Sequence, residues 1–399
     1  MRRIAWAMLL LFVFTIPWEY SLDLGSPLGN VARVVGLFTL MVAVLAVLQA
    51  KSWRKLGPLH WLVLALYLWF CCTYFWTIDP HATLEKMRGY LQEMMIVWLV
   101  WEFAEAERDL QALLRASLAG CWVLAMLTVA NLASPDAIAA GQIRFAAAGQ
   151  DPNDVARFLD FGFPMAALLL NSERRWLGRL LALGYFPLGL GAVLLTASRG
   201  GFLAVVVALG GCALLLIHKH RRAVLGGLFG LPMVGVVLWF VAPHETFERI
   251  ATIANQARGG DLNERLNIWA AGWRAFVGAP FFGHGAGSFI SASGLAPMDT
   301  AHNTALSILV EGGVCAFILS FSILVWSVRA AWQTHGPLRI ALMTLLLVWT
   351  LSSLVGTVGE SRTTWFLLGL ISLAGRLSVE EPGRFEKGLT LVEVFGGAV

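Results

Sequence analysis

The sequence predicts an all-α membrane protein with about twelve transmembrane helices and one helical cap on its outer face. Of its 399 residues, 58% are hydrophobic and only 14% are charged, whereas soluble domains carry about 25% charged residues. Apolar runs of about 20 residues, long enough to cross a hydrocarbon core of about 30 Å as helices, recur along nearly the whole chain. One long polar segment, between residues 243 and 302, is large enough to form the cap.

Hydrophobic runs between polar breaks place the individual spans. The first run follows Met1-Arg2-Arg3 and resembles a secretory signal, but residues 17–20 offer no cleavage site of small residues, so we interpret it as a retained helix. Spans are expected near residues 4–22, 30–50, 58–77, 88–106, 110–133, 153–171, 178–197, 200–217, 223–243, 303–328, 338–358 and 363–376. We therefore divide the chain into membrane helices in 1–243, the cap in 244–302, three more membrane helices in 303–376 and a tail in 377–399.

The positions of Lys and Arg predict the orientation, because cytoplasmic loops are enriched in these residues. With the N-terminus inside, the inner segments carry Arg2, Arg3, Lys51, Arg54, Lys55, Arg174, Arg175, Arg179, Lys219, Arg221, Arg222 and Arg339. Twelve spans then return the C-terminus to the cytoplasm. The outer boundary nevertheless carries Lys86, Arg88, Arg144, Arg157, Arg199, Arg249, Arg258, Arg265, Arg274 and Arg362. Since insertion disfavours cations there, we expect several of them to face a polar cavity.

Several classes of chemistry have no signature in the chain. All five cysteines lie inside apolar runs, where they act as small hydrophobic residues, and no His/Cys cluster has metal-ligand spacing. No phosphate-binding loop occurs, and the glycine-rich run 283–287 does not follow a predicted strand. The net charge of +4 is too scattered to suggest nucleic acid. We expect no metal and no cofactor, so any group-transfer reaction must take its energy from the donor.

The cap segment itself shows helical patterns. Residues 247–257 and 262–277 have helix-like apolar spacing, which predicts helices lying along the membrane surface. The run Gly283-His284-Gly285-Ala286-Gly287 then predicts a non-helical turn, with His284 as a turn residue.

The strongest local signal is Asp299-Thr300-Ala301-His302-Asn303-Thr304, which opens the tenth span. Asp299 or Thr300 can cap the helix, whose positive dipole end would face the outer interface. A histidine placed there can take a proton from a hydroxyl group, because its pKa lies near the operating pH. The alternative is an interfacial His302 that only hydrogen-bonds the cap. The sequence leaves both interpretations open.

Glu311 lies nine residues further along the same span. This spacing places it about 13 Å down the helix and on the face opposite His302. An ionisable group at that depth is a candidate for function. The neighbouring Gly312-Gly313 instead favours tight helix packing, with Glu311 as a structural acceptor.

Arg199 lies in a very short turn between two spans, Thr196-Ala197-Ser198-Arg199-Gly200-Gly201. A planar guanidinium suits phosphate because it forms two charge-assisted hydrogen bonds at once. A surface arginine that reaches out of the membrane is the alternative. The small neighbours leave the head group accessible, which favours a ligand.

Three further arginines lie near the outer ends of predicted helices. Arg265 has an acidic neighbour in the cap, and a solvated ion pair is the default interpretation of such a charge run. Arg157 follows the capping run Gln150-Asp151-Pro152-Asn153-Asp154, and at that position lining a cavity is favoured over facing lipid. Arg362 has two candidate partners, Glu360 and a ligand.

Four stretches together resemble the O-antigen ligase and polymerase superfamily of bacterial membrane glycosyltransferases. The resemblance covers about residues 140–315 by motif and implies a fold of the GT-C type. The stretches are Gln150-Asp151-Pro152-Asn153, Ser198-Arg199-Gly200, the segment from Arg265-Leu266-Asn267-Ile268-Trp269 to Gly287-Ser288-Phe289, and His302-Asn303 with Leu306, Glu311 and Gly312.

This resemblance implies transfer of a polysaccharide from undecaprenyl pyrophosphate to lipid A–core at the periplasmic face of the bacterial inner membrane, with inversion at the anomeric carbon. It implies no metal or nucleotide. Its partners would be these two glycolipids and membrane lipids, and no nucleic acid. The resemblance makes His302 the catalytic base or acceptor activator, supported by Asn303 and Glu311. Pyrophosphate ligands would be Arg199 and Arg265, with Arg157, Arg362, Lys86 and Arg88 as further candidates.

Members of the superfamily differ in their acceptor. Transferases that act on proteins usually carry an extra outer domain near the C-terminus, whereas the last span here is followed by residues 377–399, which argues against a protein acceptor. Polymerases tend to show two comparable Arg-rich outer loops, and this chain has one dominant loop, which favours a ligase. A transporter remains a rival class; it would show repeats with broken helices near the midplane.

Overall fold

A computed structural model describes residues 1–25, 28–172, 176–217, 219–252, 265–296 and 299–380. In this part of the chain the only strand-like pairing is an isolated bridge between Asp23 and Asn30, which confirms the all-α class. The long helices are α1 (Arg2–Thr15), α2 (Val31–Ala50), α3 (Pro58–Cys72), α4 (Pro80–Phe103), α5 (Glu107–Leu132), α7 (Pro152–Ser172), α8 (Trp176–Leu195), α9 (Arg199–Leu216), α10 (Arg221–Val241), α15 (Thr304–Gln333), α16 (Gly336–Val355) and α17 (Arg362–Glu380).

Nine helices among the described residues are long and apolar enough to cross a membrane, so the protein is a polytopic membrane protein. The exceptions among the long helices are α4, α7 and α17, which carry more charged residues. Several of their charged residues are inside the protein; Glu93, Asp160 and Arg376 are all buried. Buried charges of this kind lower the hydropathy of a helix without placing charge in lipid. The expected total of twelve spans stays a prediction.

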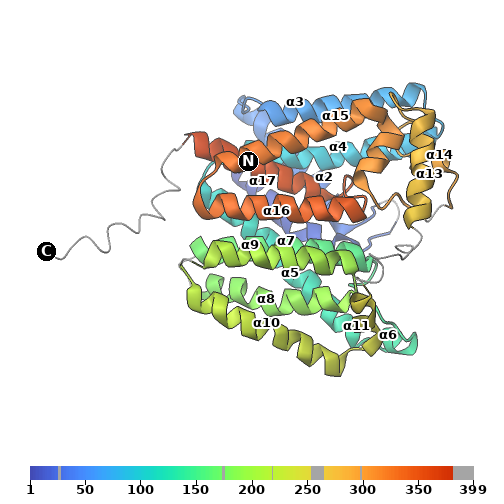
Figure 1. Cartoon of the computed structure of the whole chain (residues 1–399). Helices are drawn as coiled ribbons and strands as arrows, with labels where there is room; N and C mark the ends of the chain where they lie inside the picture. Colours follow the sequence, from blue (N-terminus) through green and yellow to red (C-terminus); the bar gives the residue numbers. More distant parts are fainter. Residues whose placement is uncertain (26–27, 173–175, 218, 253–264, 297–298, 381–399) are drawn as a thin grey trace.

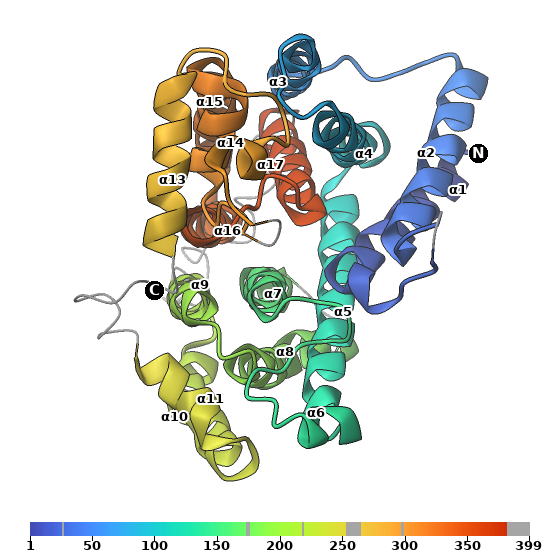
Figure 2. The ribbon, with the colours of Figure 1, turned by 90° about the vertical axis from the view of Figure 1, so that its right-hand side faces the viewer.

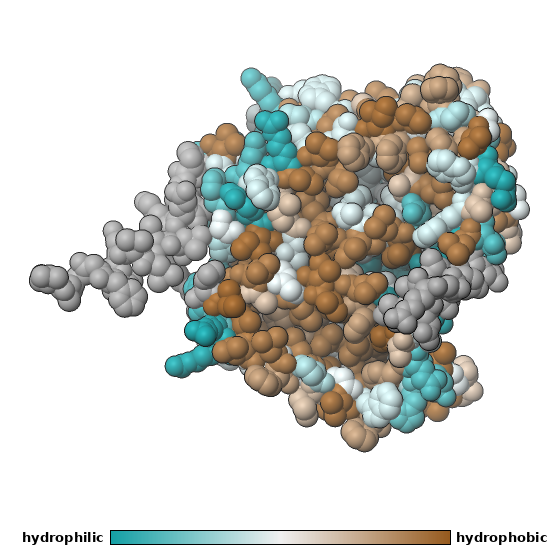
Figure 3. Space-filling view, viewed as in Figure 1, coloured by the Kyte–Doolittle hydropathy of each residue, from teal (hydrophilic) through white to brown (hydrophobic). Residues whose placement is uncertain are grey.

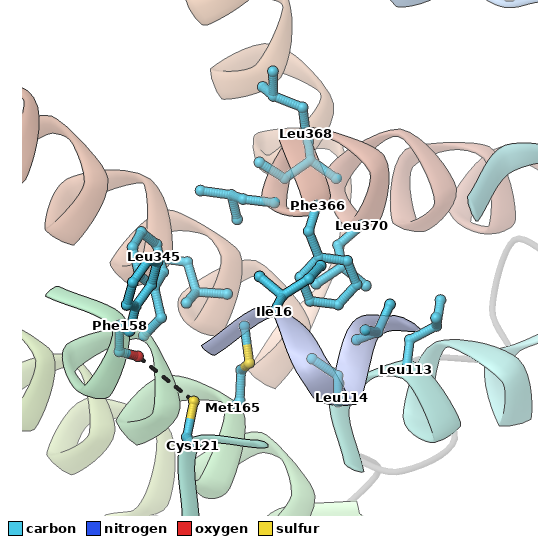
Figure 4. Close-up of a cluster of buried hydrophobic side chains, with 14 of the residues drawn as sticks. Ile16, Leu113, Leu114, Cys121, Phe158, Met165, Leu345, Phe366, Leu368 and Leu370 are labelled. Carbon is cyan, nitrogen blue, oxygen red and sulfur yellow. Dashed lines mark hydrogen bonds between the residues drawn. The ribbon is translucent and has the colours of Figure 1, made fainter. Parts of the chain in front are cut away.

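Helix α7 lies at the centre of the bundle. The end-on view shows α5, α8, α9, α16 and α17 around it (Figure 2). It buries every residue from 158 to 167, as expected for a helix that is covered on all sides. Met165 of α7 belongs to a buried apolar cluster that also contains Ile16 of η1 (Ile16–Ser21), Leu114 of α5 and Phe366 of α17 (Figure 4).

The surface carries an apolar belt between two polar ends. Hydrophobic residues cover the middle of the face in Figure 3, and hydrophilic residues gather toward its left and right margins. Helix α10 contributes strongly to this belt, because none of the residues in its Val224–Val241 window is buried. Such a belt is the surface expected of helices that face lipid.

Short helices gather at one end of the bundle, on the right in Figure 1, and we call this the cap end. They are α6 (Pro135–Ala139), α11 (His244–Ala251), α13 (Arg265–Gly278) and α14 (Phe289–Ser293). The predicted helices at 247–257 and 262–277 correspond to α11 and α13; residues 253–264, including Arg258, lie outside the described part, as do Arg174 and Arg175. Helix α17 extends to Glu380, into the predicted tail, and 381–399 are again outside it.

The glycine-rich run 283–287 forms the predicted turn and docks onto a break in α15. Gly313 has φ 65° and ψ −167°, which interrupts the helix. The backbone N–H groups of His284 and Gly285 donate to the carbonyl oxygens of Val310 and Glu311, both at 2.9 Å. The break therefore fixes the cap against the start of α15.

Candidate active site

A cavity of about 690 Å³ reaches the cap end between α4, α7, α13 and α15. Its size is typical of ligand pockets, which measure about 300–1,000 Å³. Five of the residues that the sequence singled out lie in its lining: His302, Arg265, Arg157, Glu311 and Lys86.

His302 lies just before α15, in a strained backbone conformation. Its φ of 45° is in the left-handed region, which a residue with a side chain rarely adopts. Asn303 caps the helix, since its Oδ1 accepts from the backbone N–H of Leu306 at 2.9 Å. The expectation that Asp299 or Thr300 caps α15 was therefore wrong, because the helix begins at Thr304. His302 is not needed for the cap, and its ring lies 3.5 Å from the Thr300 hydroxyl.

Two effects lower the pKa of His302 from its ordinary value of 6.5. Partial burial is the larger cause, and the charge of Arg265 adds to it. The carboxylates of Asp151, Asp154 and Asp299 act in the opposite direction but do not reverse the shift. Because a lowered pKa keeps the imidazole neutral at neutral pH, His302 can accept a proton.

Four arginines from different elements influence one another near the cavity. Burial lowers the pKa of Arg144, and repulsion from Arg249, Arg265 and Arg199 contributes to the shift. The pKa of Arg265 is likewise lowered by burial and by Arg199 and Arg249, while Asp151 opposes the change. We call Arg144, Arg199, Arg249 and Arg265 the arginine cluster; Arg265 lines the cavity and the other three lie outside its lining. Mutually repelling cations held together favour an anionic ligand.

The arginine cluster is held by contacts between two of the sequence motifs. Asn153 Oδ1 accepts from Arg144 Nη2 at 2.8 Å and from the Ser198 hydroxyl at 2.9 Å. Ser198 also caps α9, accepting from the N–H of Gly201. Arg199 follows, and its Nε donates to the carbonyl oxygen of Arg249 at 3.1 Å. Segments 150–153 and 198–200, far apart in sequence, thus form one unit.

Lys86 and Glu311 form a buried ionic group in the cavity wall. Lys86 Nζ lies 2.5 Å from Glu311 Oε2 and 2.6 Å from Glu360 Oε1. Glu311 also accepts from the N–H of Gly287 at 2.8 Å and from the Ser307 hydroxyl at 2.9 Å. The expectation that Glu311 faces away from His302 was wrong, since both line one cavity. His302 precedes the helix, so a count of helical turns does not apply to it.

The other cations that the sequence proposed as ligands lie in different surroundings. Arg157 lines the cavity and pairs with Asp154, Nη2 to Oδ1, at 2.8 Å. Arg362 forms an ion pair with the buried carboxylate of Glu19, rather than with Glu360, and lies outside the cavity lining. Arg88 is exposed on α4 and is also outside the lining.

Sequence reasoning missed several residues here. Arg144 and Arg249 were noted as outer cations but not assigned to the site. Glu93 and Asp160 belong to the cavity lining although they are only 7% and 0% exposed. An ionisable residue inside an apolar run was the available signal for both.

Fold and site together define a polytopic all-α membrane protein with a polar cavity at its cap end. The family model described as O-antigen ligase matches residues 184–321. The matched part contains Arg199, Arg265 and His302, and it confirms the resemblance to the O-antigen ligase superfamily. Members of this family are membrane glycosyltransferase-like enzymes. No match to a curated protein was found.

Proposed function

We propose that the protein is an O-antigen ligase. It transfers a polysaccharide from undecaprenyl pyrophosphate to lipid A–core at the periplasmic face of the bacterial inner membrane, in lipopolysaccharide biosynthesis. The observation that carries the proposal is His302, held at positive φ in a cavity with Arg265 beside it, within the segment that resembles O-antigen ligases.

In the proposed reaction, an acceptor hydroxyl gives its proton to a ring nitrogen of neutral His302. The hydroxyl oxygen attacks the anomeric carbon of the donor from the face opposite the pyrophosphate. A new carbon–oxygen bond forms while the bond to the phosphate oxygen breaks, so the configuration inverts. Undecaprenyl pyrophosphate leaves with the electron pair, and His302 releases its proton to solvent.

The arginine cluster is the proposed binding site for the pyrophosphate. Positive charge placed where the leaving group develops negative charge stabilises the transition state, and arginines can supply this charge without a metal ion. We assign this role to the predicted ligands Arg199 and Arg265 and also to Arg144 and Arg249. Arg157 lies in the cavity lining.

The other predicted cations receive different roles. The ammonium group of Lys86 already bonds two carboxylates, so we assign it to the wall of the cavity. Arg362 is paired with the buried carboxylate of Glu19, and Arg88 is exposed on α4. Neither belongs to the arginine cluster, so we do not retain them as pyrophosphate ligands.

The reaction is tested by mixing purified protein, undecaprenyl-pyrophosphate-linked glycan and lipid A–core without nucleotide and with a chelator. We expect the joined glycolipid to form. His302→Ala should lower its rate by at least about 100-fold, the contribution typical of a general base. The matched control is His81→Ala, at the start of α4, whose side chain is 85% exposed; it should retain the wild-type rate.

Each other outcome has a defined meaning. Longer lipid-linked glycans in place of the joined product would select a polymerase of the same superfamily. No product from either acceptor would count against glycosyl transfer and favour the transporter class. Near-full activity of His302→Ala would remove this residue from the mechanism.

A further inference from the structure

The cavity contains more acidic than basic residues in its lining. Its basic residues, apart from His302, are Lys86, Arg157 and Arg265. Its carboxylic residues are Glu85, Glu93, Asp151, Asp154, Asp160, Glu311 and Glu360. A pyrophosphate site alone does not explain this excess, because carboxylates repel phosphate. Only those carboxyl groups that have no partner within the protein can point to a second kind of ligand group.

Most of these carboxyl groups have partners within the protein. Lys86 binds Glu311 and Glu360, Arg157 binds Asp154, and Glu85 lies near His81. Asp151 accepts from the backbone N–H of Asn153. These groups are accounted for by the structure of the cavity wall.

Two buried carboxyl groups are not accounted for in this way. Among the described residues, neither oxygen of Asp160 has a hydrogen-bond partner, and Glu93 Oε2 has none. Asp160 is fully buried in α7, about 12 Å along the helix from Pro152 at 1.5 Å per residue. Burial of an unpaired polar group opposes folding, so its presence in a cavity lining points to a ligand that supplies the missing hydrogen bonds.

We propose that Asp160 forms a sugar subsite deep in the cavity, with Glu93 as a second sugar-binding group elsewhere in the same lining. The proposal rests on the proposed transferase function and adds the binding site of one of its sugars. Sugar hydroxyls are neutral groups that donate hydrogen bonds to carboxyl oxygens. An ionised phosphate has no hydrogen to donate, and a carboxylate would repel its negative charge. A hydrogen bond to a carboxyl group gains most where bulk water is excluded, and the two groups are almost closed to solvent.

The same chemistry is offered by the donor glycan and by the acceptor core, and kinetics separates the two sources. Asp160→Asn keeps the shape of the side chain but removes one acceptor oxygen. We expect it to raise KM for one of the two glycolipids about tenfold or more, the effect of leaving a buried hydrogen-bonding group unsatisfied. Inhibition by inorganic pyrophosphate, which reports on the arginine cluster, should stay within about twofold of the wild type.

Two comparisons guard against a structural explanation. Asp136→Asn removes an exposed carboxylate of α6 at the cap end, outside the cavity lining, and it should leave both KM values unchanged. Asp160→Leu should lose sugar binding yet unfold at the same or a higher temperature than the wild type, because it removes an unpaired buried polar group. A purely structural Asp160 would instead lose stability in Asp160→Leu.

Unchanged KM values for both glycolipids in Asp160→Asn and Glu93→Gln would overturn the subsite. Binding of core oligosaccharide and of donor glycan to the purified protein, followed by ligand-observed NMR, keeps the subsite separate from the ligase function. Binding that depends on Asp160 would support the subsite even if the wild-type protein formed no joined glycolipid.

Discussion

At the scale of single residues, the proposed base is prepared by its surroundings. Burial and Arg265 both lower the pKa of His302 below 6.5. Because only the neutral imidazole accepts a proton, kcat/KM should rise with pH through this lowered pKa and level off above it. Arg265→Gln removes one of the two causes, so the rising limb should move to higher pH. Burial remains, so the return toward 6.5 should be partial.

The measurement is a pH profile of kcat/KM at saturating acceptor for the wild type and Arg265→Gln. An unchanged limb, or one displaced to lower pH, would show that the limb does not report His302. Arg265 is also a proposed pyrophosphate ligand, so its loss should lower the maximal rate as well. The comparison therefore uses the pH at which kcat/KM rises, and not the maximal rate.

Local signals placed some residues in the fold. His302 lies in a recognisable motif and lines the cavity, whereas Arg199 lies in the predicted turn of small residues but outside the cavity lining. Pairing over long sequence distances had no such signal. Arg362 meets Glu19 across 343 positions, and Lys86 meets Glu311 from another helix. Both cations were therefore taken as candidate ligands, although the folded chain neutralises them.

At the scale of elements, the break in α15 holds the cap in place. Gly313 adopts φ 65° and ψ −167°, a region that is open essentially only to glycine. A β-carbon there would also lie 2.2 Å from the carbonyl oxygen of Phe281. We expect Gly313→Ala to lower the free energy of unfolding by roughly 1–3 kcal/mol or more, as measured by thermal unfolding in detergent.

The matched control is Gly235→Ala in α10, where a β-carbon would meet nothing within 4 Å. There, alanine should be neutral or slightly stabilising, because it favours a helix over glycine. Equal stability of the two variants would mean that the docked turn 283–287 does not depend on the break. Sequence reasoning indicated tight packing at Gly312-Gly313, but a local pattern does not show that a helix is interrupted by another segment.

At the scale of the whole molecule, hydropathy predicted the class of fold better than the interior of the bundle. Runs of apolar residues predicted the positions of the lipid-facing helices, because each such helix needs its own apolar surface toward lipid. Apart from the exposed Arg88, the charged residues of helices α4, α7 and α17 are paired or line the cavity, and they weaken the apolar signal of these helices. The cavity is formed in large part by α4 and α7. Its shape depends on packing between distant segments, which no single run of residues encodes.

The arrangement of the bundle also makes a prediction about orientation. The N-terminus lies at the end opposite the cap, because Arg2 pairs with Glu102 near the end of α4, which begins near the cap. Arg54 and Arg339 belong to this opposite end as well. Since cytoplasmic ends of membrane helices are enriched in Lys and Arg, the cap should face the periplasm.

Single cysteines in a variant without the native five test this orientation. Ala296 is an exposed residue of the cap, and Gln333 is exposed at the far end of α15, about 44 Å along the helix from Thr304. In intact spheroplasts, an impermeant maleimide should label Ala296→Cys, whereas Gln333→Cys should react only after permeabilisation. The reverse pattern would place the cavity in the cytoplasm, where it could not join a glycan to lipid A–core at the periplasmic face.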